Sequence, residues 1–211
     1  MNIAIKVALI GATGKAGKYL LKELLNQGYQ VKALLRKPES FTISHPNLEI
    51  VSGDIKDLDT TDHLLDSCHT VISAIGQPKD EPLVSSLAAA NLIQVMHQKR
   101  ISRYVFLAGL SIDMPGDQKS EANLQGSKWM KETFPVVTSD KEKAVQYLLE
   151  SDIEWTMVRL PWIEERDETC DLKVSLRDCL GGKIGTTDLA NFVIQQLTDP
   201  TYIRKGPFIA S

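Results

Sequence analysis

The chain has 211 residues, 43% of them hydrophobic, which suits the core of one α/β domain and leaves too little length for two full domains. The balance of 24 Lys and Arg against 27 Asp and Glu gives a formal net charge of −3, which argues against a nucleic-acid or anionic-membrane partner. No apolar run is long enough to span a membrane, and we expect a cytoplasmic protein.

Cysteine and histidine usage gives no indication of a metal site. The three cysteines are odd in number and follow no ligand spacing, so we interpret Cys68, Cys170 and Cys179 as free thiols. A cluster of potential ligands fits no metal template, because its spacing spreads it over a helix and then a strand. These residues are Asp62, His63, Asp66, Cys68 and His69.

Three regularly spaced glycines follow the first predicted strand. Ile3 to Ile10 is apolar, Gly11, Gly14 and Gly17 come next, and Lys18 to Gln27 is amphipathic. A strand that turns into a helix through such glycines presents backbone N–H groups to a phosphate. We expect Gly11 to permit the tight turn, Gly14 to admit a pyrophosphate, and Gly17 to let the helix pack closely.

The glycine loop has two alternative interpretations. A nucleotide-triphosphate P-loop would need Gly where Ala12 stands and Ser or Thr where Tyr19 stands, so it is excluded. An ordinary strand–turn–helix with incidental glycines stays possible. The regular spacing directly after a strand favours dinucleotide binding.

The second predicted strand, Gln30 to Leu35, ends in Arg36 and Lys37. In dinucleotide folds an acidic residue at this position binds the ribose of NAD, whereas an Arg accommodates the 2′-phosphate of NADP. The two cations therefore favour NADP(H) as the cofactor. The alternative is a pair of solvated charges in a turn.

Strands and helices alternate along the rest of the chain. This order predicts an α/β fold: a single doubly wound parallel-sheet (Rossmann) domain over residues 1–211, with a small C-terminal extension in which 161–211 form a substrate-side portion. Ligands then lie beyond the strand ends at Ile10, Leu35, Ser52, Ile75, Ala108 and Leu160. The further strands are expected at Leu48–Ser52, His69–Ile75, Arg103–Ala108, Glu154–Leu160, near Leu172–Val174, and at Phe208–Ala210.

Four more helices are expected, and one segment is not assigned to either class. The segment Asp113–Pro135 is polar and charged, and we interpret it as a loop or an active-site lid. The helices are expected near Thr60–Ser67 with Thr60 or Thr61 as N-cap, at Leu83–Gln98, at Thr138–Ser151, and at Asp188–Leu197 with Thr187 as N-cap.

Several motifs resemble those of the atypical short-chain dehydrogenase/reductase family, the NAD(P)-binding, NmrA-like group. They are Gly11-Ala12-Thr13-Gly14, Gly53-Asp54-Ile55 and Ala74-Ile75-Gly76. Among small members the chain looks most like the flavin reductase (biliverdin-IXβ reductase) type, on Val137-Thr138-Ser139-Asp140 and Pro161-Trp162-Ile163.

The resemblance implies roles for these residues. The glycine loop would hold the pyrophosphate, Asp54 would reach the adenine, and the end of the fourth strand would lie against the cofactor. A turn or helix-cap role is the alternative for Asp54. With the two cations after the second strand, the expected cofactor-binding residues are Gly11, Thr13, Gly14, Lys15, Ala16, Gly17, Arg36, Lys37, Asp54, Ile55, Ala74, Ile75, Gly76, Pro161 and Ile163.

The family's catalytic residues are only partly present. Such dehydrogenases use a Ser after the fifth strand and a Tyr-x-x-x-Lys in the next helix, with Tyr as the proton donor. Lys141 matches the Lys, or Lys143 if the register slips, whereas Val137 stands at the Tyr position. Gly109 stands where the Ser is expected, with Ser111 close by. The candidate catalytic residues are therefore Lys141 and Ser111.

The missing proton donor decides among reaction classes. Carbonyl reduction builds an alkoxide that needs an acid, whereas a flavin or quinone spreads negative charge over its own ring. We therefore expect an NADP(H)-dependent reductase of a small planar acceptor, with Trp129 and Trp162 as flat walls unless they are ordinary packing residues. The alternative is a non-catalytic NADP(H) redox sensor that acts through a protein partner. A carbonyl dehydrogenase or sugar-nucleotide epimerase fits less well, because the C-terminal part is short.

Overall fold

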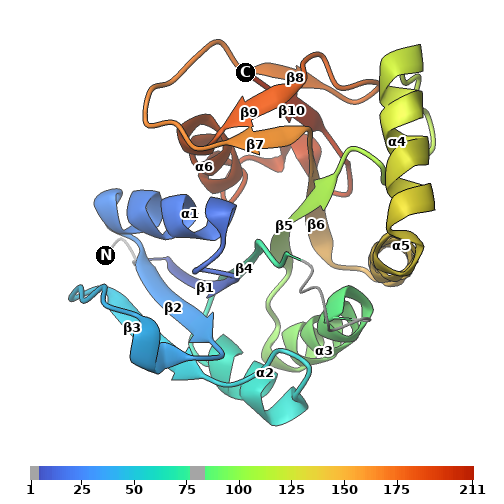
Figure 1. The fold of residues 1–211 in the computed structure, drawn as a ribbon. Helices are drawn as coiled ribbons and strands as arrows, with labels where there is room; N and C mark the ends of the chain where they lie inside the picture. Colours follow the sequence, from blue (N-terminus) through green and yellow to red (C-terminus); the bar gives the residue numbers. More distant parts are fainter. Residues whose placement is uncertain (1–4, 77–83) are drawn as a thin grey trace.

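The computed structural model describes residues 5–76 and 84–211, and within them the chain forms an eight-stranded sheet in the order β3-β2-β1-β4-β5-β6-β10-β8 (Figure 1). Neighbouring strands run parallel, apart from β8, which pairs antiparallel with β10. The predicted fold class is thereby confirmed. The strands are β1 (Lys6–Ile10), β2 (Gln30–Leu35), β3 (Leu48–Ser52), β4 (Thr70–Ser73), β5 (Arg103–Gly109), β6 (Glu154–Leu160), β8 (Lys173–Ser175) and β10 (Phe208–Ala210).

Helices cover both faces of this sheet. α1 (Lys15–Asn26) and α6 (Thr186–Gln195) pack together on one face, and α2 (Leu58–Leu65), α3 (Val84–Lys99) and α5 (Pro135–Glu150) lie on the other (Figure 1). Each face has its own apolar core. In α1, Leu20, Leu21 and Leu24 are fully buried at helical spacing, which explains why this stretch forms a helix against the sheet. Two short 3₁₀ turns, Pro38–Ser40 and Pro200–Tyr202, complete the helical elements.

The C-terminal part holds a second small sheet that the sequence pattern did not predict. β7 (Trp162–Glu164) pairs parallel with β9 (Lys183–Gly185), and the two lie near α6, β8 and β10 at the top of Figure 1. Strands of three residues are too short to show an alternating pattern. The strand expected near Leu172 is β8, shifted by one residue. Ile3 and Leu83, the expected first residues of a strand and of a helix, lie outside the described residues.

Two predicted helix caps are wrong. α2 begins at Leu58 and is capped by Asp57, whose carboxylate accepts hydrogen bonds from the N–H groups of Asp59 and Thr60, both at 3.3 Å. A carboxylate at the N-cap also complements the helix dipole, so it is preferred over the two threonines that follow. α6 begins at Thr186 after Gly185, and the Thr187 hydroxyl instead donates to the Arg166 carbonyl oxygen at 3.0 Å.

The segment Asp113–Pro135 is not a loop throughout, because it contains helix α4 (Glu121–Thr133). Only Ser127 of this helix is buried, so no apolar periodicity marks it in the sequence. Polar contacts anchor it instead: Asn123 Nδ2 donates to Asp178 Oδ1 at 2.7 Å, and Lys131 Nζ donates to Asp113 Oδ2 at 2.8 Å. Whether the segment acts as a lid stays a prediction.

Candidate functional site

The glycine loop lies where the strand order of the sheet reverses, between β1 and β4. Gly11 has a φ of +84°, and a Cβ atom there would lie 2.5 Å from the Ala74 carbonyl oxygen at the end of β4. A Cβ atom at Gly17 would lie 1.9 Å from the Gly11 carbonyl oxygen. The structure therefore confirms the expected tight turn at Gly11 and the close packing at Gly17.

The N-terminus of α1 is open to a ligand at Gly14. This residue is the N-cap, and as a glycine it has no side chain to cap the helix. Its own N–H donates to the Gly11 carbonyl oxygen at 3.0 Å. The first N–H groups of a helix lack intrahelical partners, and together with the helix dipole they favour an anion. An uncapped helix start beside a turn that excludes Cβ atoms fits a pyrophosphate.

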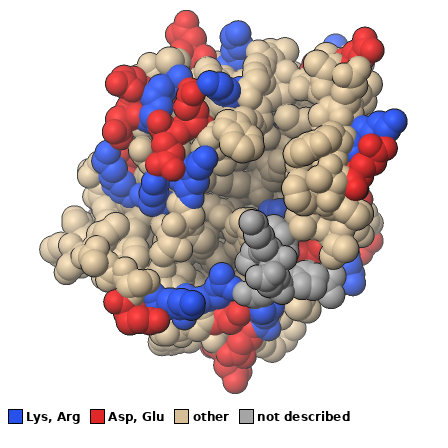
Figure 2. Space-filling model, viewed as in Figure 1, with Lys and Arg blue, Asp and Glu red and all other residues tan. Residues whose placement is uncertain are grey.

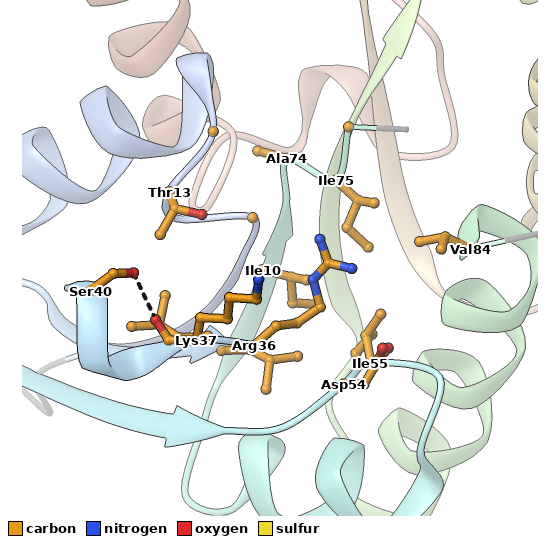
Figure 3. A pocket seen from close by; sticks show the side chains of 15 residues that line it. Ile10, Thr13, Arg36, Lys37, Ser40, Asp54, Ile55, Ala74, Ile75 and Val84 are labelled. Atoms are coloured by element: carbon orange, nitrogen blue, oxygen red, sulfur yellow. Dashed lines mark hydrogen bonds between the residues drawn. The ribbon is translucent and has the colours of Figure 1, made fainter. Parts of the chain in front are cut away.

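A cleft of about 660 Å³ opens at this point. Arg36 and Lys37 extend into it from the end of β2, facing Thr13 and Ile75 on the other side (Figure 3). Ser40 and Val84 also line the cleft, although the sequence did not indicate them. The cleft is lined by Ile10, Gly11, Thr13, Gly14, Leu34, Leu35, Arg36, Lys37, Ser40, Asp54, Ile55, Ala74, Ile75, Gly76 and Val84.

Asp54 lines this cleft and also stabilises a turn. Its Oδ1 accepts a hydrogen bond from the Lys56 N–H at 2.9 Å, and its Oδ2 lies 3.4 Å from Lys56 Nζ. This is the local turn geometry that short carboxylate side chains favour. The carboxylate is therefore held in place at the cleft wall, next to the buried side chain of Ile55.

A second cleft, of about 300 Å³, adjoins the first and extends it toward β5 and β6. The two share Gly14, Ala74, Ile75 and Gly76. In Figure 2 this side of the molecule is hollowed in the middle, with mostly uncharged walls. The further lining residues are Lys15, Ala16, Leu107, Ala108, Gly109, Lys141, Leu160, Pro161 and Ile163. Residues after each of the strand ends expected to meet a ligand, at Ile10, Leu35, Ser52, Ile75, Ala108 and Leu160, thus line one or the other cleft.

Lys141 lies in the wall of the second cleft. Its Nζ donates to the carbonyl oxygens of Ile75 at 3.2 Å and Leu107 at 3.5 Å. Burial lowers the pKa of Lys141 to about 8, partly offset by the charge of Asp140. The Asp140 carboxylate in turn accepts from the N–H of Ser85, at 2.7 Å, in the first turn of α3. Lys143, the alternative in the motif, is exposed and lies over the Tyr147 ring.

The structure does not bring Ser111 to the cleft. Its side chain is buried after the turn in which the Ile112 N–H donates to the Gly109 carbonyl oxygen at 3.2 Å, and Gly109 lines the cleft in its place. Val137, at the Tyr position of the motif, lines neither cleft. The described residues that line the second cleft therefore offer no side-chain hydroxyl.

Three lysines on one face of α1 hold the segment that follows β6. Residues 15, 18 and 22 lie on one face of the helix, and their partners are every second residue, 163, 165 and 167, of an extended segment. Side chains on one face of α1 can therefore contact alternate residues of the extended segment, and β7 lies against the start of α1. The contacts are Lys15 Nζ to the Ile163 carbonyl oxygen at 3.5 Å, Lys18 Nζ to Glu165 at 2.6 Å, and Lys22 Nζ to Asp167 at 3.3 Å.

The described residues contain neither a metal cluster nor a membrane-spanning helix. No group of three or more His, Cys, Asp or Glu side chains that could hold a metal occurs in residues 5–76 and 84–211. Over the same ranges, no helix combines the length and apolarity needed to cross a bilayer. Cys68, Cys170 and Cys179 are free, with only Cys170 exposed.

A parallel sheet with a glycine loop at its switch point defines a dinucleotide-binding Rossmann protein. A family model described as NAD(P)H-binding matches residues 11–200, and the chain belongs to this family. A short-chain dehydrogenase/reductase from Veillonella parvula, solved in complex with NADP, superposes with a TM-score of 0.82 at 16% identity, covering 99% of this chain and 95% of that one. A Rossmann-fold NAD(P)-binding family protein from Shigella flexneri superposes with a TM-score of 0.76 at 18% identity. The match covers 99% of this chain and 94% of that one.

Two relatives are similar in sequence. Uncharacterized protein YwnB of Bacillus subtilis is 23% identical over 73% of this chain and 70% of its own length. Protein TIC 62, chloroplastic, of Arabidopsis thaliana is 25% identical over 92% of this chain. The match spans only 34% of TIC 62.

Proposed function

We propose that the chain is an NADP(H)-dependent reductase that passes a hydride to a small planar acceptor such as a flavin or a quinone. The observation that carries this proposal is the second cleft, which opens directly off the glycine-loop cleft. It is lined by apolar side chains, Lys15 and Lys141, with no hydroxyl among its described lining residues. Such a cleft can orient a flat acceptor but offers no Ser or Tyr to protonate an alkoxide.

The residues of the larger cleft would hold the cofactor. The Gly11–Gly17 loop and the start of α1 suit the pyrophosphate, and Arg36 and Lys37 suit a 2′-phosphate. Asp54 and Ile55 lie where the adenosine half would extend. When bound, NADPH supplies a hydride, and an oxidised flavin or quinone that accepts it takes one further proton from water. The complex of a structural neighbour with NADP supports this choice of cofactor.

Lys141 acts on the acceptor side of the site. Its ammonium group links the ends of β4 and β5 through the Ile75 and Leu107 carbonyl oxygens. The same positive charge favours negative charge that builds up on an acceptor in the cleft. This role needs the position and charge of Lys141 and no proton transfer from it. The proposal assigns no role to Ser111.

Protein binding is the basis of the second candidate function, a non-catalytic NADP(H) redox sensor of the NmrA-like kind. The observation that favours it is a group of exposed apolar side chains on α4 and the start of α5, namely Leu124, Trp129, Phe134 and Val136. A protein partner could cover such a surface.

Steady-state oxidation of NADPH with FMN, FAD and simple quinones tests the reductase. We expect turnover well above the enzyme-free rate, and Lys141→Met should lower kcat/KM while Lys143→Met leaves it unchanged. Turnover equal to the enzyme-free rate, with one of NADPH and NADP⁺ bound more tightly in calorimetry, would favour the sensor. Failure of both nucleotides to bind would remove both candidates.

A further inference from the structure

Trp162 is the most exposed of the large apolar side chains in the described part of the chain, with 72% of its surface accessible. It begins β7 and stands between Pro161 and Ile163, which both line the second cleft. A tryptophan that serves packing is normally well buried. Trp162 is not itself among the residues that line the cleft, but an indole left in solvent between two of them is available to a ligand.

A cation accompanies this ring. Lys15 Nζ lies 5.4 Å from the centroid of the Trp162 ring, within the range of a cation–π contact. Lys15 also lines the second cleft, and its Nζ donates to the Ile163 carbonyl oxygen at 3.5 Å. An aromatic face and an ammonium group are thus placed together at the start of α1.

The charges around the second cleft point to the kind of ligand. Its charged lining residues in the described ranges are Lys15 and Lys141, and no carboxylate accompanies them. The acids on β7 and after it pair with other lysines, since Glu164 binds Lys183 at 2.7 Å and Glu165 binds Lys18 at 2.6 Å. The hydrogen bond from Lys18 lowers the pKa of Glu165, and the charge of Lys15 also contributes to lowering it. The remaining lining side chains are apolar. A ligand here would be flat, apolar over its ring, and negatively charged.

We propose that Trp162 and Lys15 form an acceptor-binding shelf, in which the indole stacks on the acceptor ring and the ammonium group binds an anionic substituent. This inference rests on the proposed reductase function and narrows its substrate class to planar anionic acceptors. FMN and riboflavin share one ring system and differ in the phosphate. The shelf therefore binds FMN more tightly than riboflavin.

Binding of FMN and riboflavin to the full chain saturated with NADP⁺ tests the shelf by calorimetry, without turnover. Trp162→Ala should lower the affinity for both flavins by at least about fivefold, because stacking on an aromatic side chain contributes to the binding of each. Lys15→Met should lower the affinity for FMN alone, and so reduce the ratio of the FMN affinity to the riboflavin affinity. The affinity for NADP⁺ is measured separately for each variant, since Lys15 borders the cofactor loop.

Two matched controls lie outside both clefts. Tyr19 is an aromatic residue of α1 with Lys18 and Lys22 near its ring, at 5.6 and 5.8 Å, and Lys143 is an exposed lysine of α5. Tyr19→Leu and Lys143→Met should leave both flavin affinities unchanged. Thermal unfolding of each variant checks that the fold is retained.

The outcomes separate this inference from the function on which it rests. If NADP⁺ does not bind the unaltered protein, the proposed function fails. If NADP⁺ binds but neither flavin does, or if Trp162→Ala leaves both affinities unchanged, the shelf is refuted while cofactor binding stands. Weaker flavin binding in Trp129→Ala but not in Trp162→Ala would move the acceptor to α4 and also overturn the shelf.

Discussion

Arg159 and Asp117 form a buried two-point ion pair, with Nη1 to Oδ2 at 2.6 Å and Nη2 to Oδ1 at 2.8 Å. The Arg159 side chain is 1% exposed, and its guanidinium group lies 3.6 Å from the centroid of the Phe208 ring. Its remaining donors reach the Ile112 carbonyl oxygen at 3.1 Å and the Gly206 carbonyl oxygen at 2.8 Å. One side chain on β6 thus fixes the loop after β5 and the approach to β10.

Removing the carboxylate of this pair should strongly destabilise the folded protein. Asp117→Ala leaves a buried guanidinium without its counter-charge, and we expect the free energy of unfolding to fall by about 3–5 kcal/mol. Asp167→Ala breaks the pair with Lys22, whose two side chains are 57% and 72% exposed, and should cost less than about 1 kcal/mol. Urea unfolding measures both. Equal losses in the two variants would contradict a structural role for the buried pair.

Two glycine substitutions should change stability in opposite directions. Gly17→Ala places a methyl group against the Gly11 carbonyl group, so the helix must shift, and we expect a loss of about 1–3 kcal/mol together with weaker NADP⁺ binding. Gly126 lies in α4 with open space around its missing Cβ, and Gly126→Ala should stabilise the protein by up to about 1 kcal/mol. Thermal unfolding and calorimetry test the pair. Similar shifts in both variants would show that the close approach at Gly17 does not matter.

Arg36 should set the preference for NADPH. A charge-assisted contact to the 2′-phosphate contributes about 1.5–3 kcal/mol, so Arg36→Ala should weaken NADPH binding by a factor of about 10 to 150 and leave NADH binding unchanged. Arg177, exposed and outside both clefts, provides the control through Arg177→Ala. Calorimetry with each nucleotide gives the affinities. Tighter binding of NADH by the unaltered protein would refute the assignment of NADP(H).

The pKa of the Lys141 side chain should be well below that of an exposed lysine. Reductive methylation with ¹³C-formaldehyde and NMR should show one lysine side-chain amine with a pKa of about 8, in addition to the α-amino group, which titrates in the same range. Lys141→Arg should remove the lysine signal and leave that of the α-amino group. A titration near the ordinary value of 10.5 would mean that Lys141 is not held in a desolvated position.

The same shift predicts how stability depends on pH. Between pH of about 8 and about 10.5, the unfolded chain holds a proton at Lys141 that the folded chain has lost. The contribution of this group to stability therefore rises with pH across that window and is lost as the pH falls through about 8. Urea unfolding of the unaltered protein minus that of Lys141→Met isolates the effect. A difference that is flat over the window would contradict the shift.

Helix α4 and the Arg159–Asp117 pair show where reading the sequence was insufficient. α4 buries only Ser127, so the apolar spacing by which helices are recognised was missing from it. A lone Arg within the apolar stretch Glu154–Leu160 signals that a buried charge needs a partner, but nothing in the spacing identifies Asp117, 42 residues earlier. The same holds for Ser111, which is near Gly109 in sequence but is buried and is not among the residues that line either cleft.

The sequence alone determined the features that depend on neighbouring residues. The strand, the three glycines and the amphipathic helix at the start of the chain impose one local geometry, because only glycine allows the φ at Gly11 and the contact at Gly17. The alternation of strands and helices then implied the doubly wound sheet and the edge at which ligands bind. Only the tertiary structure decided which side chains meet at that edge. Lys141, Lys15 and Trp162 come from two helices and a short strand. Lys15 lies more than a hundred residues before the other two, so its distances to them depend on tertiary packing.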